Sequence, residues 1–150
     1  ATHTAGPGRP LSVGEHLADS PRDLDEPDVK AWFEDALLAE TGADLAHDPL
    51  ESVAGALRAG PVRSGDLYTV ESWGDTACVI DVRAEDLTPP FAAAWHATGR
   101  TTPNRPLRLA TCRFFAVRDA DRVVGAVRGR EIVGPLRDGL VRHARTAGLG

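Results

Sequence analysis

The chain has no methionine, two cysteines, and aromatic residues at only 5% of its 150 positions. Two cysteines cannot build a disulfide-rich scaffold, and the spacing of Cys78 and Cys112 excludes a zinc ribbon or a redox CxxC motif. Both fall in predicted strands, where we expect buried thiols, although a disulfide is possible if those strands are neighbours. No apolar run approaches the roughly 20 residues of a membrane span. These absences favour an ordinary globular protein without a membrane helix.

The composition, 42% hydrophobic and 26% charged, is that of such a protein. A chain of this length most simply forms one domain. We expect a flexible N-terminal arm over residues 1–24, which are rich in Gly, Pro and polar groups, and a single α+β domain over residues 25–150. The first 16 residues lack the charged start and apolar core of a signal peptide, so we expect a cytoplasmic protein. Sixteen arginines against one lysine indicate a GC-rich bacterial genome.

The net charge of −5 is unevenly distributed, because residues 1–75 carry −10 and residues 76–150 carry +5. One interpretation is that the two halves face each other within the fold or in a homodimer. The other is that a cluster of arginines binds a small anionic molecule or an acidic protein partner. Nucleic acid is a weaker candidate, since the whole chain is acidic and no binding motif is present. The arginines in question are Arg105, Arg108, Arg113, Arg118, Arg122, Arg128 and Arg130.

The stretch from Leu107 to Arg145 contains the longest apolar run and most of the positive charge. Its first part carries apolar groups on both faces of an extended chain, which is typical of a central strand covered on both sides. Turn residues then separate shorter apolar runs. This pattern predicts a meander of three strands, at residues 107–117, 123–127 and 131–133, with turns at 119–121 and 128–130.

Capping residues and apolar spacing predict four helices. The first begins at Asp25, which can cap it, and ends at Gly42. A second begins at Asp48, where Glu51 can complete a capping box, and ends at Gly60. The remaining two are expected at residues 88–99 and 135–148.

Two further strands are predicted at Leu67–Trp73 and Ala77–Val82, with Gly74–Asp75 as the hairpin turn between them. The complete order is then αα-ββ-α-βββ-α. It predicts an α+β fold with a mainly antiparallel five-stranded sheet and flanking helices. This order resembles roadblock, longin and profilin-like domains, and an NTF2-like cone is the alternative.

The segment RFFAVRDADRVVGAVRG, followed by a helix that ends in VRHARTAGLG, resembles the middle strands and a helix of GNAT acetyltransferases. The likeness covers about a quarter of the chain. Its loop REIVGPLRDG departs from the pyrophosphate loop of that family, so no residue role is carried over.

No linear motif for catalysis, phosphate binding or metal binding is present, and the histidines are scattered, so we expect no metal and no cofactor. Asp81 interrupts an apolar strand and requires a partner, such as Arg108 or Arg113. The primary hypothesis is a binding or regulatory domain with an Arg-rich face. The alternative is a small cofactor-independent cyclase, isomerase or dehydratase of secondary metabolism, with His96 or Asp81 as the acid or base. The candidate ligand-binding residues are Arg113, Arg83, Arg105, Trp73 and Trp95.

Overall fold

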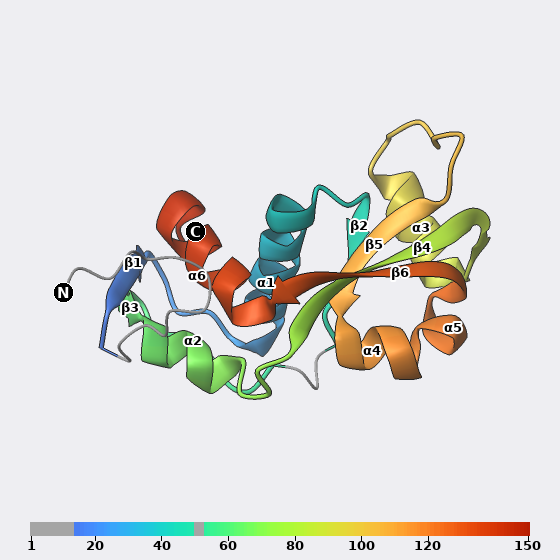
Figure 1. The fold of residues 1–150 in the computed structure, drawn as a ribbon. Helices are drawn as coiled ribbons and strands as arrows, with labels where there is room; N and C mark the ends of the chain where they lie inside the picture. The colour runs from blue at the N-terminus through green and yellow to red at the C-terminus, as the bar shows by residue number, and fades with distance from the viewer. Residues whose placement is uncertain (1–13, 50–52) are drawn as a thin grey trace.

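A computed structural model describes residues 14–49 and 53–150. Over these ranges a four-stranded sheet and a two-stranded ribbon pack with six helices (Figure 1). The elements are β1 (His16–Ser20), α1 (Glu26–Thr41), β2 (Leu45–Ala46), β3 (Gly60–Arg63), α2 (Ser64–Val70), β4 (Thr76–Leu87), α3 (Pro89–Ala97), β5 (Leu107–Cys112), α4 (Arg113–Arg118), α5 (Ala120–Val123), β6 (Gly125–Pro135) and α6 (Leu136–Ala147).

The larger sheet has the strand order β2-β5-β4-β6, and β4 pairs antiparallel with both of its neighbours. The short strand β2 pairs in parallel with β5, while β1 and β3 form a separate antiparallel ribbon. The fold is therefore α+β with antiparallel strands, as expected. The prediction of a single five-stranded antiparallel sheet is wrong.

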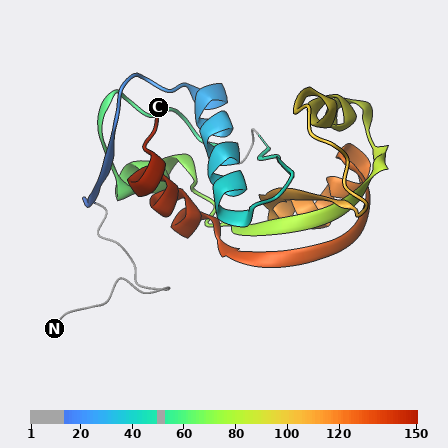
Figure 2. The same cartoon turned by 90° about the horizontal axis from the view of Figure 1, so that it is seen from above.

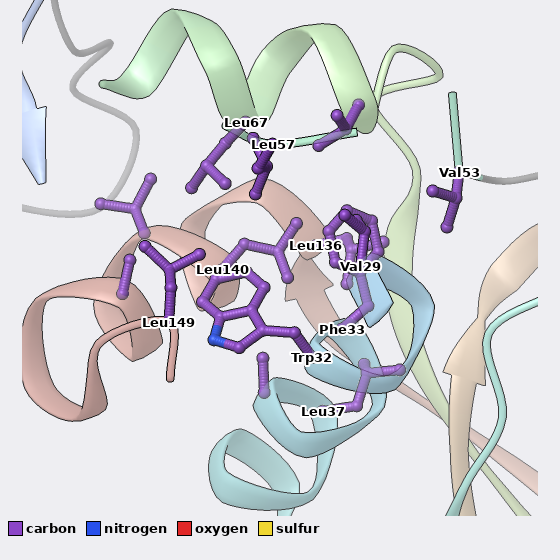
Figure 3. Close-up of a cluster of buried hydrophobic side chains, with 14 of the residues drawn as sticks. Val29, Trp32, Phe33, Leu37, Val53, Leu57, Leu67, Leu136, Leu140 and Leu149 are labelled. Carbon is purple, nitrogen blue, oxygen red and sulfur yellow. The ribbon is translucent and has the colours of Figure 1, made fainter. Parts of the chain in front are cut away.

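Helix α1 and strand β4 follow their predictions closely. Asp25 caps α1 by accepting the backbone N–H of Asp28, and Gly42 ends the helix in the left-handed conformation, with φ of 65°. The apolar stripe of α1 is buried against α6, where Trp32 lies beside Leu136 and Leu140 (Figure 3). The apolar run of residues 77–82 forms the buried part of β4.

The sheet separates two hydrophobic cores. One core joins α1, α2 and α6 to Ala77, Val79 and Ala110 of the sheet. The other joins Cys78 and Ile80 to the apolar side chains of α4 and α5. Figure 2 shows β4 and β6 as long curved strands running side by side, with α1 and α6 at one end and α3 at the other. Strand β5 is consequently buried on both faces. This agrees with the prediction for the first half of the strand expected over residues 107–117.

The predicted three-strand meander is wrong after Cys112, where the chain turns into helices α4 and α5. Strand β6 then runs from Gly125 to Pro135 without a turn at Arg128–Arg130. Gly129 lies opposite Asp81 of β4, and a Cβ atom there would lie 3.0 Å from the Asp81 Oδ2 atom. This glycine therefore allows the close approach of a neighbouring side chain within a strand. The same helices occupy most of residues 113–123 in the segment that resembled GNAT acetyltransferases, and only its last residues, 125–129, belong to a strand.

Residues 67–70, predicted as a strand because of their β-formers, belong to helix α2. The Asp66 carboxylate accepts the backbone N–H of Arg63 at 2.7 Å at the start of this helix. Leu67 and Val70 lie three positions apart and are both buried, so helical burial overrides strand propensity here. Gly74–Asp75 consequently lies in a helix-to-strand loop and not in a hairpin turn.

The predicted helix from Asp48 to Gly60 is also wrong, since residues 53–59 are not helical and 50–52, which include Glu51, lie outside the described residues. Asp48 is fully buried, and neither of its carboxyl oxygens receives a hydrogen bond from the described residues. Burial, followed by repulsion from Glu34, raises its pKa to about 7. The carboxyl group thus retains its proton in the fold at pH values where an unfolded chain has lost it.

This raised pKa predicts that stability falls as the pH rises from about 4 to about 7, by up to about 1.4 kcal/mol per pH unit. Between these values the folded chain binds more protons than the unfolded chain. Asp48→Asn should remove this slope and raise the free energy of unfolding at pH 7.5. Urea unfolding at several pH values measures both effects, with Asp35→Asn, at an exposed position of α1, as the control. An unchanged slope in Asp48→Asn would refute the assignment.

Three other expectations can be compared with the structure. Residues 16–20 of the predicted arm form β1, and residues 1–13 lie outside the described residues. Cys78 and Cys112 are buried thiols on adjacent strands, with no disulfide between them. Within residues 14–49 and 53–150, no helix has the length and apolar character needed to cross a membrane.

Candidate ligand-binding site

A surface hollow of about 680 Å³ opens between the loop that precedes β4 and the outer face of helix α4. Two short segments contribute its lining, one before β4 and one directly after β5. Pairing of β4 with β5 brings these segments together, because Ala77 lies opposite Cys112 in the antiparallel register. The lining residues are Trp73, Gly74, Asp75, Thr76, Arg113, Phe114, Val117 and Arg118.

The aromatic part of the hollow consists of Trp73 and Phe114, whose exposed fractions are 73% and 55%. Val117, one helical turn after Phe114, is 59% exposed. Large apolar side chains with such exposure in one hollow indicate a binding surface. Arg118 places its guanidinium 4.8 Å from the centre of the Phe114 ring, so a cation lies directly beside the aromatic surface.

The positive charge of the hollow comes from Arg113 and Arg118. The other five arginines of the predicted cluster form ion pairs with carboxylates, at distances between 2.7 and 3.6 Å. Neither Arg113 nor Arg118 forms an ion pair with a carboxylate of the described residues. The part of the predicted cluster that remains available for an external anion is therefore found in this hollow.

A buried ion pair holds the loop that carries Trp73. Glu71 is fully buried, and its Oε2 atom accepts hydrogen bonds from Arg137 Nε at 3.0 Å and from the Gly74 N–H at 3.1 Å. Arg137 also donates to the Glu71 backbone oxygen and stacks on Tyr68. Because Arg137 belongs to α6, this ion pair attaches the loop to the hydrophobic core formed by α1, α2 and α6.

Asp75 joins the two segments that form the hollow. Its Oδ1 atom accepts the Thr76 N–H at 2.6 Å, and its Oδ2 atom accepts the Phe114 N–H at 3.3 Å. The backbone oxygen of Asp75 accepts the N–H of Leu136 at the start of α6. One residue therefore links the Trp73 loop, helix α4 and helix α6, the first two of which carry the aromatic side chains of the hollow.

Only part of the predicted ligand-binding set meets in this hollow. Trp73 and Arg113 line it, whereas the other three residues do not. Arg83 is exposed on β4 and lies 3.7 Å from Glu85. Trp95 is buried in α3, where its Nε1 atom donates to Thr102.

Arg105, the fifth predicted residue, does bind a carboxylate, but that of Asp44 in the same chain. Two hydrogen bonds of 2.7 and 3.1 Å join its guanidinium to Asp44, which also accepts from Arg100 and from the Arg108 N–H. Burial opposes the ionisation of Asp44, yet the hydrogen bonds from Arg105 and Arg108 outweigh it and lower the pKa of this carboxyl. The guanidinium of Arg105, expected to bind an external ligand, thus binds a carboxylate of the same chain.

The two catalytic candidates lie away from the hollow. His96 is exposed on α3. Asp81 lies opposite Arg108 in the sheet, but Arg108 directs its guanidinium to Glu131 at 3.1 Å, so that predicted pair is wrong. Among the described residues no three His, Cys, Asp or Glu side chains converge as a metal site.

Phe114, Val117 and Asp75 were not among the predicted site residues, and Arg118 was predicted only as a member of the wider arginine cluster. Phe114, Val117 and Arg118 have the i, i+3, i+4 spacing of one helical face. That spacing was the available signal, but the strand assigned over residues 107–117 concealed it.

The comparisons with known proteins give a structural likeness alone. The chain is similar in structure to a 5′-nucleotidase precursor from Thermus thermophilus, with a TM-score of 0.62 and 14% sequence identity. The match covers 87% of this chain and 36% of that chain, so this chain spans about a third of the length of the nucleotidase. No protein-family model and no curated protein matches the sequence.

Proposed function

We propose that this chain is a binding domain for a small molecule that is both aromatic and anionic, with nucleotides as the favoured class. The observation that carries this proposal is the meeting of Trp73 and Phe114 with Arg113 and Arg118 in one hollow. The aromatic pair supplies flat apolar surfaces, and the two arginines supply guanidinium groups that form no ion pair with a carboxylate of the described residues.

Nucleotides fit this combination because a base has a flat π-face and a phosphate carries negative charge. Stacking of a base on an aromatic side chain contributes about 1–3 kcal/mol. A guanidinium binds phosphate through charge-assisted hydrogen bonds, often two at a time. The volume of about 680 Å³ lies within the roughly 300–1,000 Å³ of small-molecule sites.

The structural likeness supports nucleotides over other aromatic anions, because the similar protein is named a 5′-nucleotidase. Since this chain spans about a third of that protein's length, we assign to it the recognition of a nucleotide and not its hydrolysis. The lining of the hollow agrees with this assignment, because it offers groups that hold a base and a phosphate.

The test is a calorimetric titration of the chain with the four nucleoside monophosphates, followed by the nucleoside of the tightest binder. We expect saturable one-site binding and a weaker affinity for the nucleoside, because it lacks the phosphate. Replacing Arg113 and Arg118 together by alanine should weaken nucleotide binding by about 10- to 100-fold for each hydrogen bond to the phosphate that is lost, since such a bond to a charged group contributes about 1.5–3 kcal/mol.

The same variant should bind the nucleoside with nearly the wild-type affinity. Arg122→Ala is the matched control, because Arg122 belongs to the same arginine cluster but pairs with Asp119 and does not line the hollow. Equal losses in the double variant and in this control would contradict the assignment, as would the absence of binding by all four nucleotides.

A further inference from the structure

The hollow contains a carboxylate whose acceptor capacity is only partly used. Asp75 lines the hollow, and its two oxygens each accept one backbone N–H, from Thr76 and from Phe114. A carboxylate oxygen has two lone pairs, so each oxygen retains one acceptor position. The residue lies two positions after Trp73, accepts the backbone N–H of Phe114, and lines the same hollow as both aromatic side chains.

An ionised carboxylate accepts hydrogen bonds and donates none, so a carboxylate in a base-binding site distinguishes bases by the donors on their edges. Guanine presents two adjacent donors, its N1–H and its exocyclic amino group, on a single edge. Adenine and cytosine present an amino group beside an unprotonated ring nitrogen, which would repel the second carboxylate oxygen. Uracil presents one ring N–H between two carbonyl oxygens.

From this geometry we infer that the hollow selects guanine nucleotides. The inference rests on the proposed function, since it concerns the base held by Trp73 and Phe114. The base stacks on the aromatic side chains, its N1–H and amino group donate to the two oxygens of Asp75, and Arg113 or Arg118 binds the phosphate. The backbone hydrogen bonds from Thr76 and Phe114 hold the carboxylate in position for this pairing.

The test compares GMP, IMP and AMP in calorimetric titrations of the unaltered chain. IMP retains the ring N1–H of GMP but lacks the amino group, and AMP lacks the N1–H. Because a bidentate contact to a base edge discriminates by about 1–3 kcal/mol, we expect GMP to bind about 10- to 100-fold more tightly than AMP, with IMP between them. Equal affinities for the three nucleotides, or a preference for AMP, would overturn the inference while leaving the proposed function in place. No binding by any of the three would overturn the inference, and the absence of binding by all four nucleoside monophosphates would overturn both.

Asp75→Asn provides the second arm, because it replaces one acceptor by a donor with almost no change in shape. The ratio of GMP to AMP affinity should fall to about 1 or invert in this variant. A thermal unfolding curve shows whether the variant folds, and the wild-type series decides the question if it does not. A folded Asp75→Asn protein with the wild-type ratio would overturn the role of this carboxylate.

Discussion

Arg137→Ala should lower the free energy of unfolding by about 3 kcal/mol or more, an unusually large loss for a residue whose side chain is one-third exposed. The reason is its partner, because the substitution would leave the fully buried carboxyl group of Glu71 without its ion-pair partner. The backbone oxygen of Glu71 would also lose two hydrogen bonds. Urea unfolding monitored by circular dichroism measures the change.

Arg142→Ala is the matched control on the same helix. Arg142 pairs with Glu40 near the protein surface, where an exposed ion pair contributes about 0–1 kcal/mol. Equal losses of stability in both variants would contradict the claim that the buried Glu71 depends on its ion pair with Arg137. If Arg137→Ala also weakens nucleotide binding although it does not line the hollow, the Trp73 loop depends on this ion pair.

Trp73→Ala and Phe114→Ala should each weaken nucleotide affinity by about 10- to 100-fold, since each removes a stacking surface worth about 1–3 kcal/mol. Both side chains are more than half exposed, so neither substitution should change the free energy of unfolding by more than about 0.5 kcal/mol. The variants therefore separate binding from folding. Calorimetric titration and urea unfolding of the same samples measure the two quantities.

Ile132→Ala is the control for these aromatic variants. Ile132 is 57% exposed on β6 and does not line the hollow. It should bind nucleotides with wild-type affinity. A loss of affinity at Ile132 equal to that at Trp73 would indicate a nonspecific apolar surface and not a binding site for a base.

The elements predicted correctly are those whose signals are local. Asp25 and Gly42 fix the ends of α1 through hydrogen bonds and backbone conformation within a few residues of each end. The apolar run of residues 77–82 identifies the buried part of β4 without knowledge of which strands lie beside it. Predictions from such local signals agree with the structure because they do not depend on distant parts of the chain.

The errors arose where tertiary packing decides the local structure. The β-formers of residues 67–70 are helical because α2 buries Leu67 and Val70. Gly129 resembles a turn residue, but its role depends on Asp81, which is 48 positions away in the sequence and opposite it in the sheet. A linear pattern cannot distinguish a glycine at a turn from a glycine beside a neighbouring strand.

The candidate site shows the same division. Trp73 and Arg113 were predicted from residue type alone, as an aromatic wall and a cation. Their proximity depends on the antiparallel pairing of β4 with β5, and the sequence analysis had no means to rank them above Trp95 or Arg105. Arg105 and Arg113 carry the same guanidinium group, and only the structure shows that the guanidinium of Arg105 is already paired with Asp44.

The contact between a nucleotide base and Trp73 can be observed directly by NMR, through the indole N–H signals of the three tryptophans during a titration with GMP. Trp32 and Trp95 are only 7% and 6% exposed, so they serve as internal references. Binding in the hollow predicts a saturable shift of the Trp73 signal with little change at the other two, the signal being assigned with Trp73→Phe. A Trp73 signal that stays unchanged at saturating GMP, or a shift confined to Trp95, would contradict the account.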